Sequence, residues 1–334
     1  SFTEPWLGGR RPNALSLTAY HSVQTNGETK FLKEDKIFVR DLEDNKIVNP
    51  LRASVLITGL SVGLGRRLSW PDDYFTLYQE ISYQHYIMNK WQAFVFSDGT
   101  ANNLFYRFNI SRNSIDQPIF PRTGSQLSLS VQATPPYSAF NNNDYSDPAL
   151  STQEKYKYIE YHKWKFTTSW FSQLVGNLVL NTRIGFGYLG SYNKLLGTAP
   201  LERFYLGGSG LSGYSLDGRE IIALRGYDDN TLSPNTGASI INKYTMELRY
   251  PFSLNPSATI YGLGFVEAGK TWTEFGKYNP FNVYKSTGVG VRIFLPMFGL
   301  LGLDYAWRLD DVPEYPSMKR GQLHFTIGAN LGEL

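Results

Sequence analysis

The feature that most constrains this chain is an alternation of apolar and polar residues with a period of two, which recurs from one end of the chain to the other. In residues 124–133, for example, Leu127, Leu129 and Val131 alternate with serine and glutamine. Successive side chains of a β-strand point to opposite faces of the sheet. The pattern therefore predicts strands with one apolar face and one polar face.

The alternating stretches are too long for an ordinary soluble sandwich. Strands of soluble proteins usually have about 5 to 6 residues, whereas these stretches run for about 10 to 15 residues, enough to cross a bilayer. Aromatic residues make up 15% of the chain, and aromatic girdles mark the two interfaces of a membrane barrel. No run approaches the roughly 20 consecutive apolar residues of a membrane helix. We therefore expect an all-β fold, a transmembrane antiparallel β-barrel.

The alternation predicts about twelve strands, and an even number is typical of a bacterial barrel. The expected strands are 14–24, 51–65, 74–90, 102–113, 123–134, 156–171, 176–191, 238–250, 258–270, 283–295, 299–309 and 321–331. Their connections are tight turns, as at Asn255-Pro256, or long loops, as at 135–155 and 192–237. This asymmetry is expected when turns occupy one rim of a barrel and loops the other.

The composition excludes several classes of function. With 32 basic and 29 acidic residues, the net charge of +3 is too balanced to favour nucleic acid as a partner. Cysteine is absent, which excludes disulfides, thiolate metal sites and a cysteine nucleophile. None of the four histidines is spaced like a pair of metal ligands: His21, His85, His162 and His324. We expect no metal site.

Two motifs that suggest an enzyme have simpler explanations. Gly185 to Gly190 spell the glycine pattern of a dinucleotide site, but that site needs a helix after the strand, and here the glycines alternate within a strand. Ser209 lies among glycines without the helix-forming residues that follow a nucleophile elbow. We expect no catalytic residues and no cofactor.

The long connection 192–237 carries the tripeptide Arg225-Gly226-Tyr227. A long connection without secondary structure is usually either disordered or functional. This one contains many aromatic and aliphatic residues, among them Phe204, Tyr205 and Leu224. We therefore expect a loop that folds inward and packs in the lumen of the barrel.

The segments "ERFYLGGSGLSGY" and "ALRGYDDNTLSP" resemble the sixth extracellular loop of the BamA superfamily of outer-membrane insertases and two-partner secretion proteins. The resemblance continues through "TMELRYPF", "GFVEAGKTW" and "QLHFTIGANL", and so covers essentially the whole chain. The family's tripeptide stands here as Arg225-Gly226-Tyr227. Several motifs in the same order are more specific than any one of them.

The resemblance implies a domain organisation. It implies that 1–334 is a partial outer-membrane barrel, the C-terminal part of sixteen strands, without the first four strands and without the periplasmic POTRA domains. It also implies that the last strand carries the signal for the protein's own assembly, formed by Phe325, Ile327, Gly328 and Leu331. Family barrels commonly close on an aromatic residue, so Leu331 is expected to weaken that signal.

The function implied is the insertion and folding of β-barrel proteins in the bacterial outer membrane, as the central subunit of an assembly machinery. Its partners are then the lipid bilayer, nascent outer-membrane barrel proteins and accessory lipoproteins. Two alternatives stay open. One is a two-partner secretion pore of the same superfamily, and the other is a passive porin, which needs no Arg-Gly-Tyr loop.

We expect Arg225 to reach carboxylates on the inner wall, namely Glu247 and Glu267. The alternation in 244–250 turns Glu247 inward. If Glu267 points inward, the alternation also turns Phe265 inward, which is acceptable when a packed loop covers its ring. The resemblance adds a second argument, because the family pairs its loop arginine with acids at the two matching positions. A planar guanidinium suits bidentate contacts with carboxylates. The alternative is an arginine exposed to solvent in a mobile loop.

Overall fold

The structure is a computed structural model that describes residues 1–9, 13–34, 37–40, 43, 45–92, 96–141, 143–209, 219–328 and 334. Strands dominate: β1 (Phe2–Glu4), β2 (Asn13–Thr25), β3 (Lys33–Glu34), β4 (Ile37–Phe38), β5 (Ser54–Arg67), β6 (Phe75–Asn89), β7 (Gly99–Asn113), β8 (Gly124–Ala133), β9 (His162–Gln173), β10 (Val179–Gly190), β11 (Phe204–Leu206), β12 (Glu220–Ile222), β13 (Ile240–Asn255), β14 (Ala258–Trp272), β15 (Tyr284–Leu295), β16 (Gly299–Arg308) and β17 (Gly321–Ile327). The helices are short: η1 (Leu7–Gly9), η2 (Tyr137–Ala139), α1 (Thr152–Lys155) and η4 (Phe275–Lys277). Within the described ranges, no helix is long and apolar enough to cross a membrane.

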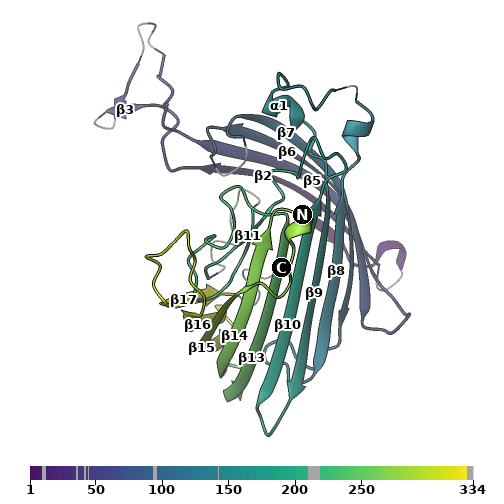
Figure 1. Cartoon of the computed structure of the whole chain (residues 1–334). Coiled ribbons are helices and arrows are strands. Elements are labelled where there is room, and N and C mark those ends of the chain that lie inside the picture. The colour runs from purple at the N-terminus through teal and green to yellow at the C-terminus, as the bar shows by residue number, and fades with distance from the viewer. Residues whose placement is uncertain are drawn as a thin grey trace.

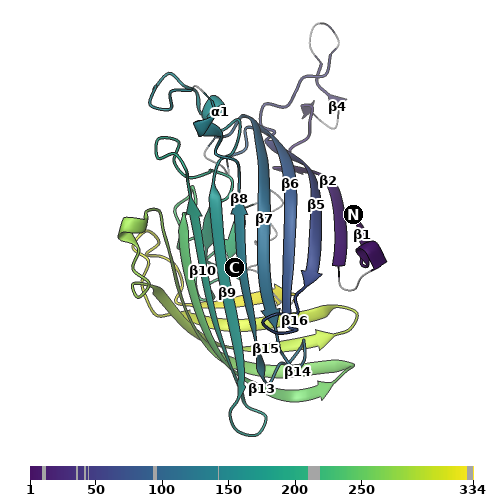
Figure 2. The ribbon, with the colours of Figure 1, turned by 90° about the vertical axis from the view of Figure 1, so that its right-hand side faces the viewer.

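Thirteen strands form one large sheet in the order β1-β2-β5-β6-β7-β8-β9-β10-β13-β14-β15-β16-β17. All its neighbouring pairs are antiparallel. The sheet curves strongly, so that β13 to β16 run at a steep angle to β6 to β9 (Figure 2). The expected all-β barrel fold and its twelve strands are confirmed, and the short β1 is an additional strand. In the part of the chain that the structure describes, β1 and β17 are the two edges of the sheet.

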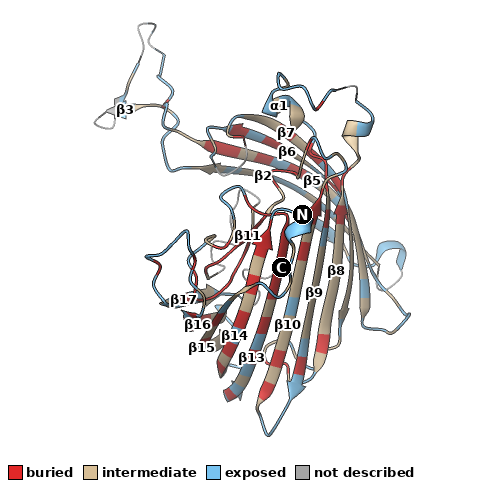
Figure 3. Cartoon of the chain, in the orientation of Figure 1, coloured by how far each residue is buried: buried red, intermediate tan, exposed pale blue. Residues whose placement is uncertain are grey.

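The alternation in the sequence becomes two different faces of the sheet (Figure 3). One outer row crosses five neighbouring strands in register, from Tyr250 through Gly262, Val291 and Leu303 to Phe325. The four large side chains of this row are 39 to 50% exposed. A parallel row on the inner face contains Arg249, Leu263, Gly290, Asp304 and His324. The apolar row suits contact with lipid, and the polar row faces the lumen.

The connections differ between the two rims of the sheet. Residues 256–257 and 296–298 are tight turns, whereas 26–53, 134–161, 191–239 and 309–320 are long. The first of these long connections carries the β3–β4 hairpin, which projects away from the sheet (Figure 1). The expected asymmetry of rims is thus present.

The connection between β10 and β13 lies inside the curve of the sheet, where β11 and β12 form a small parallel pair (Figure 1). Several of its side chains are completely buried: Phe204, Leu206, Ile222, Leu224 and Tyr227. They pack in one core with inward residues of β5 and β6, such as Val55 and Tyr86. The described part of the loop is therefore folded into the lumen, while 210–218 lie outside the described residues.

If the outer rows face lipid, a charge there must be costly. We expect Leu303→Lys to lower the free energy of unfolding by about 2 to 4 kcal/mol if the residue lies near the bilayer midplane. Urea titration of the protein in lipid vesicles measures this.

Ser128→Lys is the matched control, because Ser128 lines the lumen and a lysine there stays hydrated. Gly290 is unsuitable as a control, since a Cβ atom on it would lie 1.8 Å from Oδ1 of Asp304. Equal losses for Leu303→Lys and Ser128→Lys would contradict the assignment of the two faces.

Candidate functional site: the loop anchored in the lumen

The inner wall of β13, β14 and β16 presents three buried carboxylates. Thr245 of β13 pairs with Glu267 of β14 in register, and Glu247 lies two residues along β13 on the same inner face. Asp304 comes from β16, two strands beyond β14. All three acids are at most 2% exposed. Buried carboxylates are costly unless they are paired, so their position favours a cation that can reach all three.

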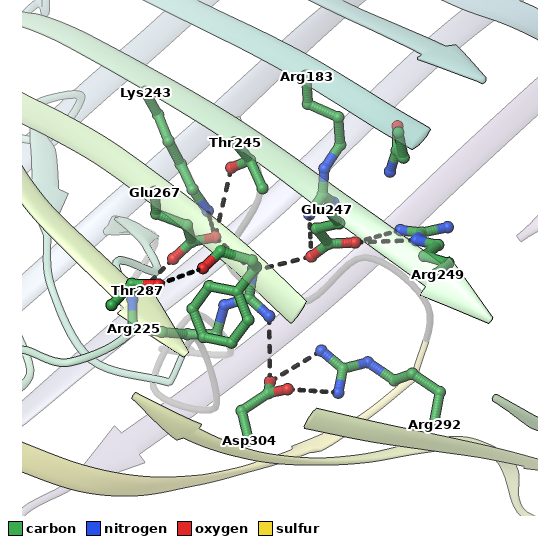
Figure 4. Close-up of polar contacts among 12 residues, drawn as sticks. Arg183, Arg225, Lys243, Thr245, Glu247, Arg249, Glu267, Thr287, Arg292 and Asp304 are labelled. Carbon is green, nitrogen blue, oxygen red and sulfur yellow. Dashed lines mark hydrogen bonds and ion pairs between the residues drawn. The ribbon is translucent and has the colours of Figure 1, made fainter. Parts of the chain in front are cut away.

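Arg225 of the loop supplies that cation. Its Nη2 lies 2.8 Å from a carboxylate oxygen of Glu247 and 2.8 Å from one of Glu267, and its Nη1 lies 3.3 Å from Asp304 (Figure 4). Its backbone N–H also donates to Glu267 over 2.9 Å. One guanidinium therefore joins three strands of the wall, which a point charge such as a lysine ammonium cannot do with the same geometry.

The ring of Phe265 supports the flat side of this arginine. The guanidinium carbon lies 3.5 Å from the centre of the ring, which places the cation on the electron-rich face. Phe265 follows the inward phase of β14 and is 3% exposed. The phase that brings Glu267 inward thus also provides the stacking partner.

The two residues that follow Arg225 hold the loop close to the wall. Gly226 has a φ of 91°, and a Cβ atom there would lie 3.1 Å from the backbone nitrogen of Arg308, so the turn and the close approach both favour glycine. Tyr227 is fully buried and donates from its hydroxyl to the carbonyl of Lys285 over 2.7 Å.

Each of the three carboxylates has a cation of the wall as well. Their contacts are Arg183 and Arg249 with Glu247 at 3.0 and 2.6 Å, Arg292 with Asp304 at 2.7 Å, and Lys243 with Glu267 at 3.8 Å. With Arg225, the described cluster holds five cations against three carboxylates. The carboxylates are therefore the scarce partners, and Glu267, with the most distant wall cation, depends most on Arg225.

A second group of ion pairs holds an earlier part of the loop against β9, two strands from β13 in the sheet. Lys163 of β9 contacts Glu202 at 3.1 Å and Glu220 at 2.8 Å, and Lys165 contacts Glu220 at 2.8 Å. Lys163 is 5% exposed and lies over the ring of Phe204. Burial opposes ionisation of Glu220, but the two lysines lower its pKa to about 2. The loop is thus tied to β9 through carboxylates of its own and to β13, β14 and β16 through its arginine.

The structure brings together the loop residues and wall acids named from the sequence, and it adds partners that the sequence analysis did not name. Asp304 was missed as a partner, although the alternation of β16 places it on the polar face. Lys163, Glu202 and Glu220 were also missed, because no local pattern indicates which wall residues a folded loop will meet.

The residues expected to form the assembly signal lie on and just after the last strand. Phe325 and Ile327 are 44 and 47% exposed on the outer face of β17. Gly328 follows the strand, and its backbone N–H donates to the carbonyl of Leu300. Leu331 lies outside the described residues. The role of these residues in assembly stays a prediction.

The excess of cations over carboxylates in the cluster predicts which substitution lowers the free energy of unfolding more. We expect Glu247→Gln to cost about 3 to 5 kcal/mol, because it leaves buried arginines without their carboxylate. We expect Arg225→Ala to cost less, because Glu247 and Asp304 keep arginines of the wall within 3.0 Å. Urea titration in vesicles gives both values, and a larger loss for Arg225→Ala would contradict the charge balance.

The second group of ion pairs predicts a separate effect. We expect Lys163→Met to speed amide exchange in β11 and β12 while the segment around Arg225 keeps its protection, because the two anchors use different strands and share no side chain. Hydrogen exchange followed by mass spectrometry resolves the two segments. Lys277→Met is the control, since Lys277 belongs to an exposed ion pair with Glu274. Equal loosening of both segments by Lys163→Met would show that the anchors are not independent.

A solved barrel structure shares this fold. A solved structure of BamA from Haemophilus ducreyi lacking POTRA domains 1–3 aligns with a TM-score of 0.65 at 16% identity, over 96% of this chain and 60% of that one. CdiB from Escherichia coli aligns with a TM-score of 0.49 at 12% identity, over 94% of this chain and 49% of that one. The chain thus spans less than two thirds of the length of either structure. A search of curated proteins finds no match.

The family model described as the Omp85 superfamily domain matches residues 1–330, nearly the whole chain. The resemblance expected from the loop and strand motifs is thereby confirmed. The chain belongs to the Omp85 superfamily of outer-membrane β-barrel proteins.

Proposed function

We propose that this protein inserts and folds β-barrel proteins in the bacterial outer membrane, as the central subunit of an assembly machinery. The family, the outer apolar rows and the anchored loop support the proposal. Its partners are then the lipid bilayer, unfolded barrel proteins and accessory lipoproteins. No covalent step, nucleotide or cofactor is required.

The physical problem that such a protein solves is the unpaired strand edge. Each backbone N–H or C=O group without a partner in lipid costs several kcal/mol. A strand of the insertase that pairs with the incoming strand satisfies those groups while the new barrel forms. The edge strand β17 has the outward apolar row that such a template needs on its lipid side, with Leu323, Phe325 and Ile327 all more than 40% exposed.

The observation that carries the proposal is the occupied lumen. The loop is held inside by buried ion pairs with β9 and with β13, β14 and β16. Passage of a polypeptide through the lumen requires these contacts to break, whereas templating at an edge strand leaves them intact. The same occupancy disfavours a passive porin.

A two-partner secretion pore of the same superfamily is the alternative. It shares the fold and the loop motif, but its substrate crosses through the lumen. A covalent lock on the loop therefore separates the two functions. Since residues 1–334 contain no cysteine, cysteines introduced at Lys165 and Glu220 are the only thiols in this part of the protein, and a short bismaleimide can bridge them.

The test uses the full-length protein in lipid vesicles with a urea-denatured barrel protein as substrate. We expect faster appearance of the heat-modifiable folded substrate than in empty vesicles, and the same rate after Lys165→Cys/Glu220→Cys is cross-linked. The double variant without cross-linker is the control. If wild-type protein does not accelerate folding but admits a secreted polypeptide to the vesicle interior, and the cross-link blocks that entry, the secretion function replaces our proposal.

A further inference from the structure

His324 is a buried titratable group that the charge cluster around Arg225 does not explain. It lies on the inner face of β17, is 4% exposed and stands opposite Asp304 in register. Its Nε2 lies 2.8 Å from the backbone nitrogen of Gly226. A backbone N–H can only donate, so Nε2 must accept and must carry no proton.

A second contact joins the same two segments. The side-chain amide of Gln322, two residues before His324 on the same face, donates to Asp228 over 2.8 Å. The loop therefore runs along the inner side of β17 and holds it at two consecutive inward positions. The tripeptide is tied to the last strand as well as to the wall behind it.

We propose that His324 is a positioning residue that couples the Arg-Gly-Tyr loop to the last strand, and that its protonation releases the strand from the loop. A proton on Nε2 turns the acceptor into a donor that faces the N–H of Gly226. The hydrogen bond is then lost and replaced by the repulsion of two donors. The imidazolium also adds a positive charge beside Arg225.

The charged groups around His324 come from each element packed against it. Asp304 faces it from β16, Glu267 from β14, and Arg225 and Asp229 from the loop. The charge of Asp304 is already engaged by Arg292 and Arg225. The contact is present above the pH range in which His324 takes up its proton, and it is lost as the pH falls through that range.

The consequence for function rests on the proposed insertase activity. In the described residues β17 pairs with β16, and the loop contacts hold it on the lumenal side. Releasing them frees the strand that is proposed to receive the incoming substrate. A fall in pH then loosens β17 through the protonation of His324 alone.

Hydrogen exchange at the amide of Gly226 tests the coupling directly, with the full-length protein in vesicles and no substrate present. After correction for the intrinsic exchange rate, we expect up to about tenfold faster exchange per pH unit as the pH falls through the titration of His324. His324→Gln retains an acceptor but takes up no proton in this range, so its exchange should change less than about twofold per pH unit.

His21→Gln is the matched control. His21 lies on the outer face of β2 with its ring near Thr58, and its replacement should leave the pH dependence as in the wild type. Equal pH dependence in wild type and His324→Gln would overturn the proposal, and so would wild-type exchange that does not respond to pH.

A second measurement uses the wild-type protein, so it does not depend on the folding of a variant. The titration of the His324 ring, followed by NMR, must have the same midpoint as the change in Gly226 exchange, and different midpoints would also overturn the coupling. Because neither experiment contains substrate, failure of the vesicle folding assay would reject the proposed function and leave this inference standing.

Discussion

The burial of one positive charge inside a membrane barrel organises this molecule. The guanidinium of Arg225 is stable in the lumen because Glu247, Glu267 and Asp304 surround it and Phe265 supports its flat face. These contacts require β13, β14 and β16 to be in one register and the loop to turn at Gly226. A loop without this anchor would be held in the lumen only by its apolar packing and by the ion pairs with β9.

The wall that receives the arginine is itself rich in cations. Arg183, Arg249, Arg292 and Lys243 share the same three carboxylates. The loop arginine therefore shares its carboxylate partners with cations of the wall, so that removing it leaves no carboxylate without a cation.

The two groups of ion pairs have opposite polarity. On β9 the sheet provides lysines and the loop provides carboxylates, whereas on β13, β14 and β16 the loop provides the cation. The two anchored parts of the loop therefore cannot exchange places, since that would bring like charges together. This polarity places Arg225-Gly226-Tyr227 beside β16 and β17, where the last strand is held.

Alternation of residue types by itself determined the strands, the two faces and the inward phase of Glu247, because a side chain's face in a strand follows from its position alone. The resemblance carried by the loop motifs added the pairing of Arg225 with Glu247 and Glu267. Only the tertiary structure decided that Asp304 completes the group, that Lys163 and Lys165 hold the other end of the loop, and that His324 accepts from Gly226. These contacts join residues 39 to 98 positions apart. They depend on the register between strands and on the path of the loop through the lumen, and no local pattern of residues encodes either.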